Sequence, residues 1–249
     1  MAFKLLTSLK NEFLELLFPI KCAVCERETE GAQKNKLICL ACLKNLTPSL
    51  SLYCPLCEAK TIDGGLCFSC KMIGGETGNF KLDKLLYPFS YKDPTVEKII
   101  KVFKYDFIKG LAEPIEKLMA NYLKKIKERI DLNELLGIPI PLHRIKFNHR
   151  GYNQSELIAD EIAKCQNIKV LKNCLVKIKS TKDQAKLKEN ERLKNLNGAF
   201  KCLKPELISG QKILLVDDVY TSGATMNECA KVLKEAGAKE VIGLVIARG

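Results

Sequence analysis

The chain is 249 residues long, with 47% hydrophobic residues, 28% charged residues, 12 cysteines and a formal net charge of +12. This composition is that of an ordinary globular protein, and it excludes a collagen-like, low-complexity or wholly disordered chain. The length lies between one large domain and two ordinary ones, and the positive charge favours polyanions or phosphorylated ligands as partners.

The charge is unevenly distributed along the chain. Residues 1–80 carry 9 basic and 8 acidic side chains, a net +1, whereas residues 81–249 carry 32 basic and 21 acidic side chains, a net +11. The cysteines show the opposite bias, since eight of them lie between Cys22 and Cys70. This shift in composition predicts a domain boundary before residue 81.

The first predicted element is an amphipathic helix over residues 1–19. Apolar side chains recur there at intervals of three or four residues, and Pro19 would end the helix. Polar residues such as Lys10 and Glu15 interrupt the apolar stretch, which argues against a signal peptide. The apolar stripe fits docking on the protein itself, or alternatively a partner helix or a membrane surface. No apolar run approaches the roughly 20 residues that span a bilayer, so we expect a protein that is not integral to the membrane.

The cysteine-rich region contains four successive C-x-x-C pairs. Two residues between thiolates allow one tight turn to direct both sulfurs at the same ion, and two such pairs complete the four-sulfur shell of structural zinc. The spacing therefore predicts a double zinc ribbon over residues 20–74 with two structural Zn²⁺ ions. The eight predicted ligands are Cys22, Cys25, Cys39, Cys42, Cys54, Cys57, Cys67 and Cys70.

The spacing leaves two ways of pairing these cysteines. Sequential pairing, first pair with second and third with fourth, lets each unit close locally, and we favour it over an interleaved arrangement. Disulfides are disfavoured without a secretory signal, and redox chemistry needs a single C-x-x-C at a helix start. The remaining cysteines are expected to be small core residues. These are Cys165, Cys174, Cys202 and Cys229.

Residues 81–249 alternate apolar runs with amphipathic segments, which predicts an α/β domain with a mostly parallel sheet and flanking helices. Asp93 and Pro94 predict a helix start, as N-cap and first helical residue. Further helices are predicted over residues 112–129, 154–165 and 226–236, and strands over residues 135–140, 168–178 and 212–216.

A strongly basic segment lies within this domain. Residues 169–212 carry 12 basic and 4 acidic side chains, a net +8. Such a segment suits a loop that closes over a substrate, an electrostatic track for single-stranded nucleic acid, or simply a solvated face. Phe200 is its one aromatic residue, so the segment permits DNA binding without indicating base stacking.

The most informative stretch is a buried strand followed by two acids and a small polar loop that opens a helix. The loop offers backbone N–H groups and hydroxyls to a phosphate, to which the helix N-terminus adds a favourable dipole. Asp217 and Asp218 would repel a phosphate, so we expect them to hold the vicinal hydroxyls of an adjoining sugar. The stretch predicts a ribose 5-phosphate site made of Asp217, Asp218, Thr221, Ser222, Gly223, Ala224 and Thr225.

This stretch resembles the phosphoribosyl pyrophosphate signature of type I phosphoribosyltransferases. The resemblance implies that Asp217 and Asp218 bind the ribose 2′- and 3′-hydroxyls and that Thr221 to Thr225 bind the 5-phosphate. It also implies that Mg²⁺ accompanies phosphoribosyl pyrophosphate and bridges pyrophosphate and sugar oxygens.

Two further segments narrow the resemblance to the ComF family of competence proteins. I-P-I-P-L-H at residues 138–143 and R-G-Y-N-Q at residues 150–154 resemble the family's V-P-x-P and R-G-F-N-Q motifs. The pattern from Thr181 to Phe200 resembles its T-x-x-Q-x-x-L, R-x-x-N and A-F motifs. With the cysteine pairs, the resemblance covers nearly the whole chain from Cys22 onward. It implies a double zinc ribbon joined to a type I phosphoribosyltransferase-like domain.

The proline-containing segment and the basic residues after it are the candidates for pyrophosphate binding. The resemblance implies that a stiff loop at the end of the strand approaches pyrophosphate, which Lys146 and Arg150 would neutralise. Arg150 and Gln154 fit equally well a second interpretation, in which they brace the helix that begins near Asn153. The two histidines have no partner visible in the sequence and receive no catalytic role.

The ComF resemblance implies a cytoplasmic protein that acts in DNA uptake and natural transformation. It would handle single-stranded DNA together with other competence proteins, such as the translocation helicase. The alternative is an active phosphoribosyltransferase, in which a nucleophile displaces pyrophosphate at the anomeric carbon. The sequence contains no recognisable hood for an acceptor base, so turnover and acceptor both stay open.

Overall fold

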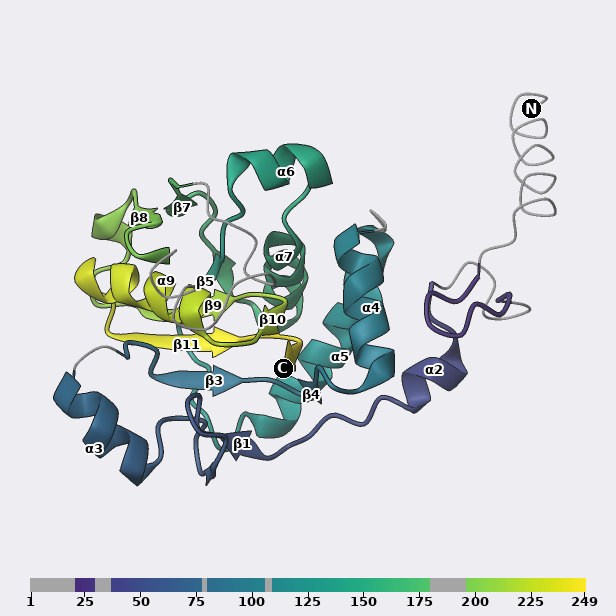
Figure 1. Cartoon of the computed structure of the whole chain (residues 1–249), viewed down its shortest axis with the longest axis horizontal. Coiled ribbons are helices and arrows are strands. Elements are labelled where there is room, and N and C mark those ends of the chain that lie inside the picture. Colours follow the sequence, from purple (N-terminus) through teal and green to yellow (C-terminus); the bar gives the residue numbers. More distant parts are fainter. Residues whose placement is uncertain (1–20, 30–36, 78–79, 106–108, 180–195) are drawn as a thin grey trace.

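The computed structural model describes residues 21–29, 37–77, 80–105, 109–179 and 196–249, drawn in colour in Figure 1. The predicted helix over residues 1–19 lies outside these residues. So does most of the lysine-rich stretch between residues 180 and 195.

A five-stranded sheet forms the centre of the second domain. Its strand order is β3-β11-β9-β5-β6, and every neighbouring pair is parallel. This confirms the predicted α/β class. The strands span Lys84–Leu86 (β3), Glu240–Leu244 (β11), Lys212–Val216 (β9), Leu135–Pro139 (β5) and Lys169–Val170 (β6).

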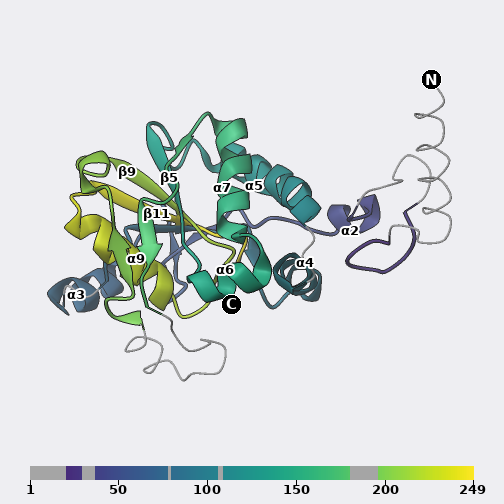
Figure 2. The same cartoon turned by 90° about the horizontal axis from the view of Figure 1, so that it is seen from above.

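Both faces of this sheet are covered by helices, which explains why its central strand β9 is apolar from Ile213 to Val216. Leu214 and Val216 of β9 face one hydrophobic core, whereas Ile213 and Leu215 face the other. Figure 2 shows α5 and α7 on one side of the sheet and α9 on the other. These helices span Ala112–Ile126 (α5), Gln154–Gln166 (α7) and Ala224–Glu235 (α9).

Several helix boundaries follow from local side-chain capping. Asp93 Oδ1 accepts hydrogen bonds from the backbone N–H groups of Thr95 at 2.8 Å and Val96 at 3.2 Å, which caps α4 (Pro94–Tyr105) as predicted. Asn153 caps α7 in the same way. One short helix was not predicted. It is α6, it spans Arg144–Arg150, and it begins after the N-cap His143.

The expectation of one strand over residues 168–178 is wrong. This stretch forms β6 and then β7 (Leu175–Lys177), and the turn between them includes Asn173 at a φ of 56°. The turn takes β7 away from the parallel sheet, and β7 pairs instead with the antiparallel strand β8 (Phe200–Cys202). Apolar residues recur on both sides of Asn173, so their pattern does not reveal the break. The break falls at Asn173 because Asn tolerates the left-handed region.

The isolated cysteines differ in burial. Cys174 and Cys229 are buried, as expected, and Cys202 is half-buried. Cys165 is exposed, so its assignment to the core is wrong. It lies at the polar surface of α7, where its thiol contacts the carboxylate of Glu116.

A second, three-stranded parallel sheet lies beside the first, in the order β10-β12-β4. Its strands span Val219–Tyr220 (β10), Ala247–Arg248 (β12) and Phe89–Ser90 (β4). The described residues of the domain also include the 3₁₀ turns η2 (Lys109–Leu111) and η4 (Pro205–Leu207). Within the residues described, no helix has the length and apolar character needed to cross a membrane.

The two cysteine-rich units occupy different places. Figure 1 shows the first, around α2, at the far right of the molecule, and the second, around β1 and α3, next to β3. The second unit is fixed to the sheet, because Leu85 N–H donates to the Gly64 carbonyl at 2.9 Å. Arg129 of the second domain also donates to carbonyls of this unit. The elements are α2 (Leu40–Lys44), β1 (Leu52–Tyr53), β2 (Lys60–Thr61) and α3 (Phe68–Thr77).

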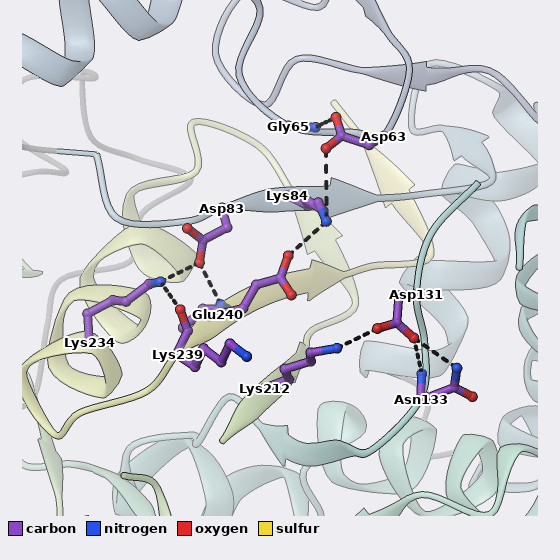
Figure 3. A network of polar contacts seen from close by, with 11 residues as sticks. Asp63, Gly65, Asp83, Lys84, Asp131, Asn133, Lys212, Lys234, Lys239 and Glu240 are labelled. Atoms are coloured by element: carbon purple, nitrogen blue, oxygen red, sulfur yellow. Dashed lines mark hydrogen bonds and ion pairs between the residues drawn. The ribbon is translucent and has the colours of Figure 1, made fainter. Parts of the chain in front are cut away.

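Ion pairs gather where the central strands begin (Figure 3). Lys84 on β3 contacts Glu240 on β11 at 2.8 Å, and Lys212 on β9 contacts Asp131. Such surface pairs contribute little stability individually. Their position is informative, because these charges occupy the amino ends of the strands and leave the carboxyl ends for other residues.

Candidate functional site

A cavity of about 600 Å³ lies at the carboxyl ends of β5 and β9. The two strands are neighbours in the sheet, so the segments that follow them meet there, as is usual for binding sites in parallel α/β folds. The volume suits a small phosphorylated molecule. All nine non-cysteine residues predicted from the sequence line it, namely Lys146, Arg150, Asp217, Asp218, Thr221, Ser222, Gly223, Ala224 and Thr225.

The loop from Thr221 to Thr225 forms one wall of the cavity. Gly223 adopts a φ of +73° and is the N-cap of α9, and no side chain caps this helix end. The first N–H groups of a helix have no intrahelical partner, and the first turn of α9 contains no acidic residue. The loop and the helix start therefore present a positive electrostatic end that suits an anion.

Asp217 lies directly after β9 and is held by two hydrogen bonds. Its Oδ1 accepts from Ser155 Oγ at 2.8 Å and from the backbone N–H of Asp218 at 2.9 Å. Burial, reinforced by the negative charge of Asp218, raises the pKa of Asp217 to about 7. Adjacent carboxylates thus occupy different environments, since Asp218 has a cationic partner.

That cationic partner is Lys104 of α4, whose Nζ lies 2.9 Å from Asp218 Oδ1. Both side chains are largely buried, with exposures of 21% and 10%. Sequence reasoning missed Lys104, and it also missed Ser155. Ser155 could have been found from its position directly after the R-G-Y-N-Q motif. The only signal for Lys104 was its i,i+3 spacing from Lys101, which also lines the cavity.

The opposite wall comes from the segment after β5. Lys146 and Arg150, one turn apart on α6, both line the cavity. Arg150 Nη1 also donates to Gln154 Oε1 at 2.7 Å, which confirms the contact expected for a brace at the start of α7. His143 lines the same wall, and its Nδ1 accepts a hydrogen bond from the Ile145 N–H at 3.3 Å as the cap of α6.

The remaining wall is partly apolar. It includes Tyr91, Ile140, Leu142 and Phe200. Lys177 Nζ lies 5.4 Å from the ring centroid of Phe200, close enough for a cation–π contact. The cavity therefore combines acids for hydroxyl groups, an anion-binding loop, several cations and an apolar surface for a planar group.

The eight cysteines predicted as ligands form two groups of four. One consists of Cys22, Cys25, Cys39 and Cys42 and the other of Cys54, Cys57, Cys67 and Cys70, with the sulfurs of each group within 4.8 Å of one another. The sequential pairing is confirmed. Zn–S bonds of about 2.3 Å in a tetrahedron separate the sulfurs by about 3.8 Å. The Cys25 and Cys39 sulfurs lie 3.8 Å apart and those of Cys57 and Cys67 3.5 Å apart, so the groups fit structural zinc.

At one cysteine of each group, backbone N–H groups favour the thiolate form that zinc requires. Burial alone would raise the pKa of Cys22, but N–H groups of Cys39, Cys25 and Val24 outweigh it and lower the pKa to about 6. At Cys54, N–H groups likewise outweigh burial and lower the pKa to about 7. A thiolate stabilised by N–H donors is ready to bind a metal near neutral pH.

Two family models match separate parts of the chain. The double zinc ribbon domain model matches residues 13–71, and the phosphoribosyl transferase domain model matches residues 153–249. The parallel sheet and its covering helices are accordingly a type I phosphoribosyltransferase-like fold.

Three relatives resemble the chain over different lengths. Competence protein F of Haemophilus influenzae is 26% identical over 215 residues, which cover 82% of this chain and 93% of that protein. Competence protein ComFC of Bacillus subtilis is 26% identical over 204 residues, covering 82% and 80%. A DNA utilization protein of Escherichia coli is 31% identical over 104 residues, covering 42% of this chain and 45% of that protein.

Proposed function

The chain belongs to the ComF family of competence proteins, and we propose that it acts in DNA uptake and natural transformation through a cavity that binds a phosphoribosyl group. The names of its relatives, competence proteins and a DNA utilization protein, support the cellular role. The chemistry of the cavity supports the ligand class.

One observation carries the ligand proposal. Two acids directly follow β9, an anion-binding loop directly follows the next strand, β10, and both line one cavity. A carboxylate accepts hydrogen bonds from hydroxyl groups, whereas a helix N-terminus attracts a phosphate. Ribose 5-phosphate carries a phosphate and two vicinal hydroxyl groups on one sugar, so it satisfies the two halves of the site together. Asp217 and Asp218 would hold the ribose and Thr221–Thr225 the 5-phosphate.

Phosphoribosyl pyrophosphate extends this ligand toward the opposite wall. Lys146 and Arg150 lie there, and the planar guanidinium of Arg150 suits two phosphate oxygens at once. Mg²⁺ would accompany this ligand and neutralise part of its charge. The carboxylates of Asp217 and Asp218 are the kind of oxygen ligand that Mg²⁺ prefers.

Single-stranded DNA is the proposed macromolecular partner. Cations from several elements surround the cavity, and a DNA 5′ end shares with ribose 5-phosphate a phosphate on the 5-carbon of a pentose. Its sugar lacks the free 2′- and 3′-hydroxyls, so the loop at Thr221–Thr225 and the cations would recognise it without the acids. We place this function in the cytoplasm, in contact with other competence proteins such as the translocation helicase. Recognition of a strand end would link the phosphoribosyl-type pocket to DNA handling.

Turnover as a phosphoribosyltransferase is the second candidate function. It is favoured by the apolar surface of Tyr91, Ile140, Leu142 and Phe200 in the same cavity, because a planar acceptor would pack on such a surface. The acceptor would attack the anomeric carbon while the bond to pyrophosphate breaks and Lys146 and Arg150 stabilise the departing charge. A screen for pyrophosphate release with nucleobases and amines tests it, since release must depend on the acceptor.

Calorimetry of phosphoribosyl pyrophosphate with Mg²⁺ tests the ligand proposal. We expect binding to the zinc-loaded protein, and about 100-fold weaker binding after the double substitution Asp217→Asn with Asp218→Asn, because two charged acceptors are lost. Asp131→Asn is the matched control, since Asp131 pairs with a lysine at the other end of β9. Unchanged affinity in the double variant, or no binding to the unmodified protein, would contradict the proposal.

A further inference from the structure

The second zinc unit is in direct contact with the strand that leads into the phosphate-binding loop. Tyr220 is the last residue of β10 and immediately precedes Thr221. Its hydroxyl donates a hydrogen bond to the Pro55 carbonyl at 3.1 Å. Pro55 lies within the turn between Cys54 and Cys57, so this bond joins the phosphate loop to a zinc-binding turn.

Arg248 makes a second connection to the same turn. It is the register partner of Tyr220 in the parallel pair β10–β12. Its Nη1 donates to the Cys54 carbonyl at 2.9 Å and its Nη2 to the Leu56 carbonyl at 3.4 Å. The guanidinium carbon lies 5.2 Å from the centre of the Tyr220 ring, so the two side chains also contact each other.

The Tyr220 side chain packs against the loop that it precedes. A Cβ atom placed on Gly223 would lie 2.1 Å from Tyr220 Oη, so only a glycine leaves room for the hydroxyl. Tyr220 and Arg248 are buried, with exposures of 3% and 7%. A displacement of the turn at Cys54 to Cys57 would therefore move a buried ring that supports Gly223, because close-packed interiors transmit such shifts.

The first zinc unit contacts the domain at a different place. Lys98 of α4 pairs with Glu26 at 2.6 Å, and both side chains are well exposed, at 40% and 74%. The first unit also shares a hydrophobic core with this domain, since Cys22 and Cys42 belong to the same buried cluster as Ile99 of α4. These contacts involve α4, whereas those of Tyr220 and Arg248 involve the strand that precedes the loop at Thr221–Thr225. The two zinc sites, which share the same ligand set, thus differ in how they join the phosphoribosyltransferase-like domain.

We propose that Tyr220 and Arg248 are positioning residues that couple the second zinc site, and not the first, to the phosphate-binding loop. This inference rests on the proposed function, because it takes an anion bound at Thr221–Thr225 as the ligand that the loop holds. Loss of zinc from the second site would then weaken phosphate binding, and by reciprocity a bound ligand would slow zinc loss from that site.

Two single substitutions test this division between the zinc sites. Cys57→Ser removes one ligand of the second site, and Cys25→Ser is the matched change in the first site. Each residue is the second of the four cysteines in its own site. Zinc analysis should give one ion per chain in each variant. We expect affinity for phosphoribosyl pyrophosphate to fall at least about fivefold in Cys57→Ser and to stay within about twofold in Cys25→Ser. Equal losses in both variants would overturn the proposal.

Tyr220→Phe tests the connection with both zinc sites intact. The ring keeps its place under Gly223, and only the hydrogen bond to Pro55 is lost. In the unmodified protein, saturating phosphoribosyl pyrophosphate should slow zinc transfer from the second site to a chromogenic chelator at least about fivefold. In Tyr220→Phe this protection should fall to about twofold or less, although the variant still binds two zinc ions. Undiminished protection in Tyr220→Phe would overturn the coupling, since a tyrosine that only stabilises the fold would leave the protection by the ligand unchanged.

Hydrogen exchange separates this inference from the ligand proposal, because it needs no ligand. Amides of residues 219–226 should exchange faster in Cys57→Ser and Tyr220→Phe than in the unmodified protein, and at an unchanged rate in Cys25→Ser. If phosphoribosyl pyrophosphate does not bind the unmodified protein, the ligand proposal fails while this comparison still tests the coupling. Unchanged exchange in Cys57→Ser would overturn the coupling itself.

Discussion

Lys104 Nζ lies 2.9 Å from Asp218 Oδ1 and joins α4 to the segment that follows β9. The neighbouring acid, Asp217, is held instead by the hydroxyl of Ser155 on α7. The acidic pair is therefore anchored by two helices that lie far from it in the sequence. Asp218 therefore has a cation as its partner, whereas Asp217 has a neutral donor. We expect the two acids to respond differently to substitution and to pH for this reason.

Replacement of Lys104 should be costly because it leaves the largely buried Asp218 carboxylate without its cation. We expect Lys104→Met to lower the free energy of unfolding by about 1–3 kcal/mol at pH 7, measured by urea denaturation. Lys101→Met is the control on the same helix. Lys101 pairs with Glu97 at an exposed position, where the loss should be about 0.5 kcal/mol or less. Equal losses would contradict a special role for the buried pair.

Asp217 should make the protein less stable as the pH rises toward neutrality. Its pKa in the folded protein is about 7, above its ordinary value of 3.8, because burial and the Asp218 charge disfavour ionisation. The folded state therefore holds this proton more tightly, so the contribution of Asp217 to stability is full below about pH 4 and is lost as the pH rises to about 7.

Asp217→Asn removes this titration. The variant should gain stability relative to the unmodified protein between pH 4 and pH 8, by on the order of 4 kcal/mol at the upper end, at about 1.4 kcal/mol for each unit by which the pKa is raised. The difference between the two proteins is the relevant quantity, because zinc thiolates titrate in both of them. A difference that does not change with pH would show that Asp217 ionises normally.

Arg150 has two predicted roles that different ligands can separate. If Arg150 and Lys146 bind pyrophosphate, Arg150→Gln and Lys146→Gln should each weaken phosphoribosyl pyrophosphate binding about 10-fold or more. Ribose 5-phosphate lacks the pyrophosphate, so calorimetry should show its affinity unchanged within about twofold. Equal loss of both ligands in Arg150→Gln would mean that Arg150 acts only through its hydrogen bond to Gln154.

Gly223 should be far less replaceable than Gly151, although both adopt a positive φ, at 73° and 72°. A Cβ on Gly151 would meet nothing within 4 Å, whereas one on Gly223 would meet the Tyr220 hydroxyl. We expect Gly151→Ala to cost about 1 kcal/mol of backbone strain. Gly223→Ala should cost about 1–3 kcal/mol more, measured by thermal unfolding, because overpacking is added. Similar losses of stability in Gly151→Ala and Gly223→Ala would show that the Tyr220 ring moves aside at little energetic cost.

Binding of single-stranded DNA should depend steeply on salt if phosphates contact the cations around the cavity. The logarithm of the affinity falls by about 0.7 per phosphate contact for each unit of the logarithm of salt concentration. Lys146→Gln should therefore reduce the slope by about 0.7, whereas Lys125→Gln on the exposed side of α5 should leave it unchanged. Fluorescence anisotropy at several salt concentrations measures both, and a slope near zero would contradict DNA binding at this site.

Features carried by contiguous residues could be predicted from the sequence. Each C-x-x-C pair, and the run from Asp217 to Thr225, places its chemistry within one turn or one strand-to-loop junction. Backbone geometry fixes the separation of such neighbours, so their local arrangement follows from spacing. The break at Asn173 could not be predicted in this way, because the apolar pattern on either side of it continues unchanged.

Only the tertiary structure decided which distant residues complete the site. Ser155 and Asp217 are 62 residues apart, Pro55 and Tyr220 are 165 apart, and Cys54 and Arg248 are 194 apart. Sheet order brings them together, since β5 and β9 pair, as do β10 and β12. The sequence alone determined the two kinds of domain and the local arrangement of the cysteine pairs and of the run from Asp217 to Thr225. It left open their partners, because a hydrogen bond between such distant residues exists only after the strands have paired and the helices have packed.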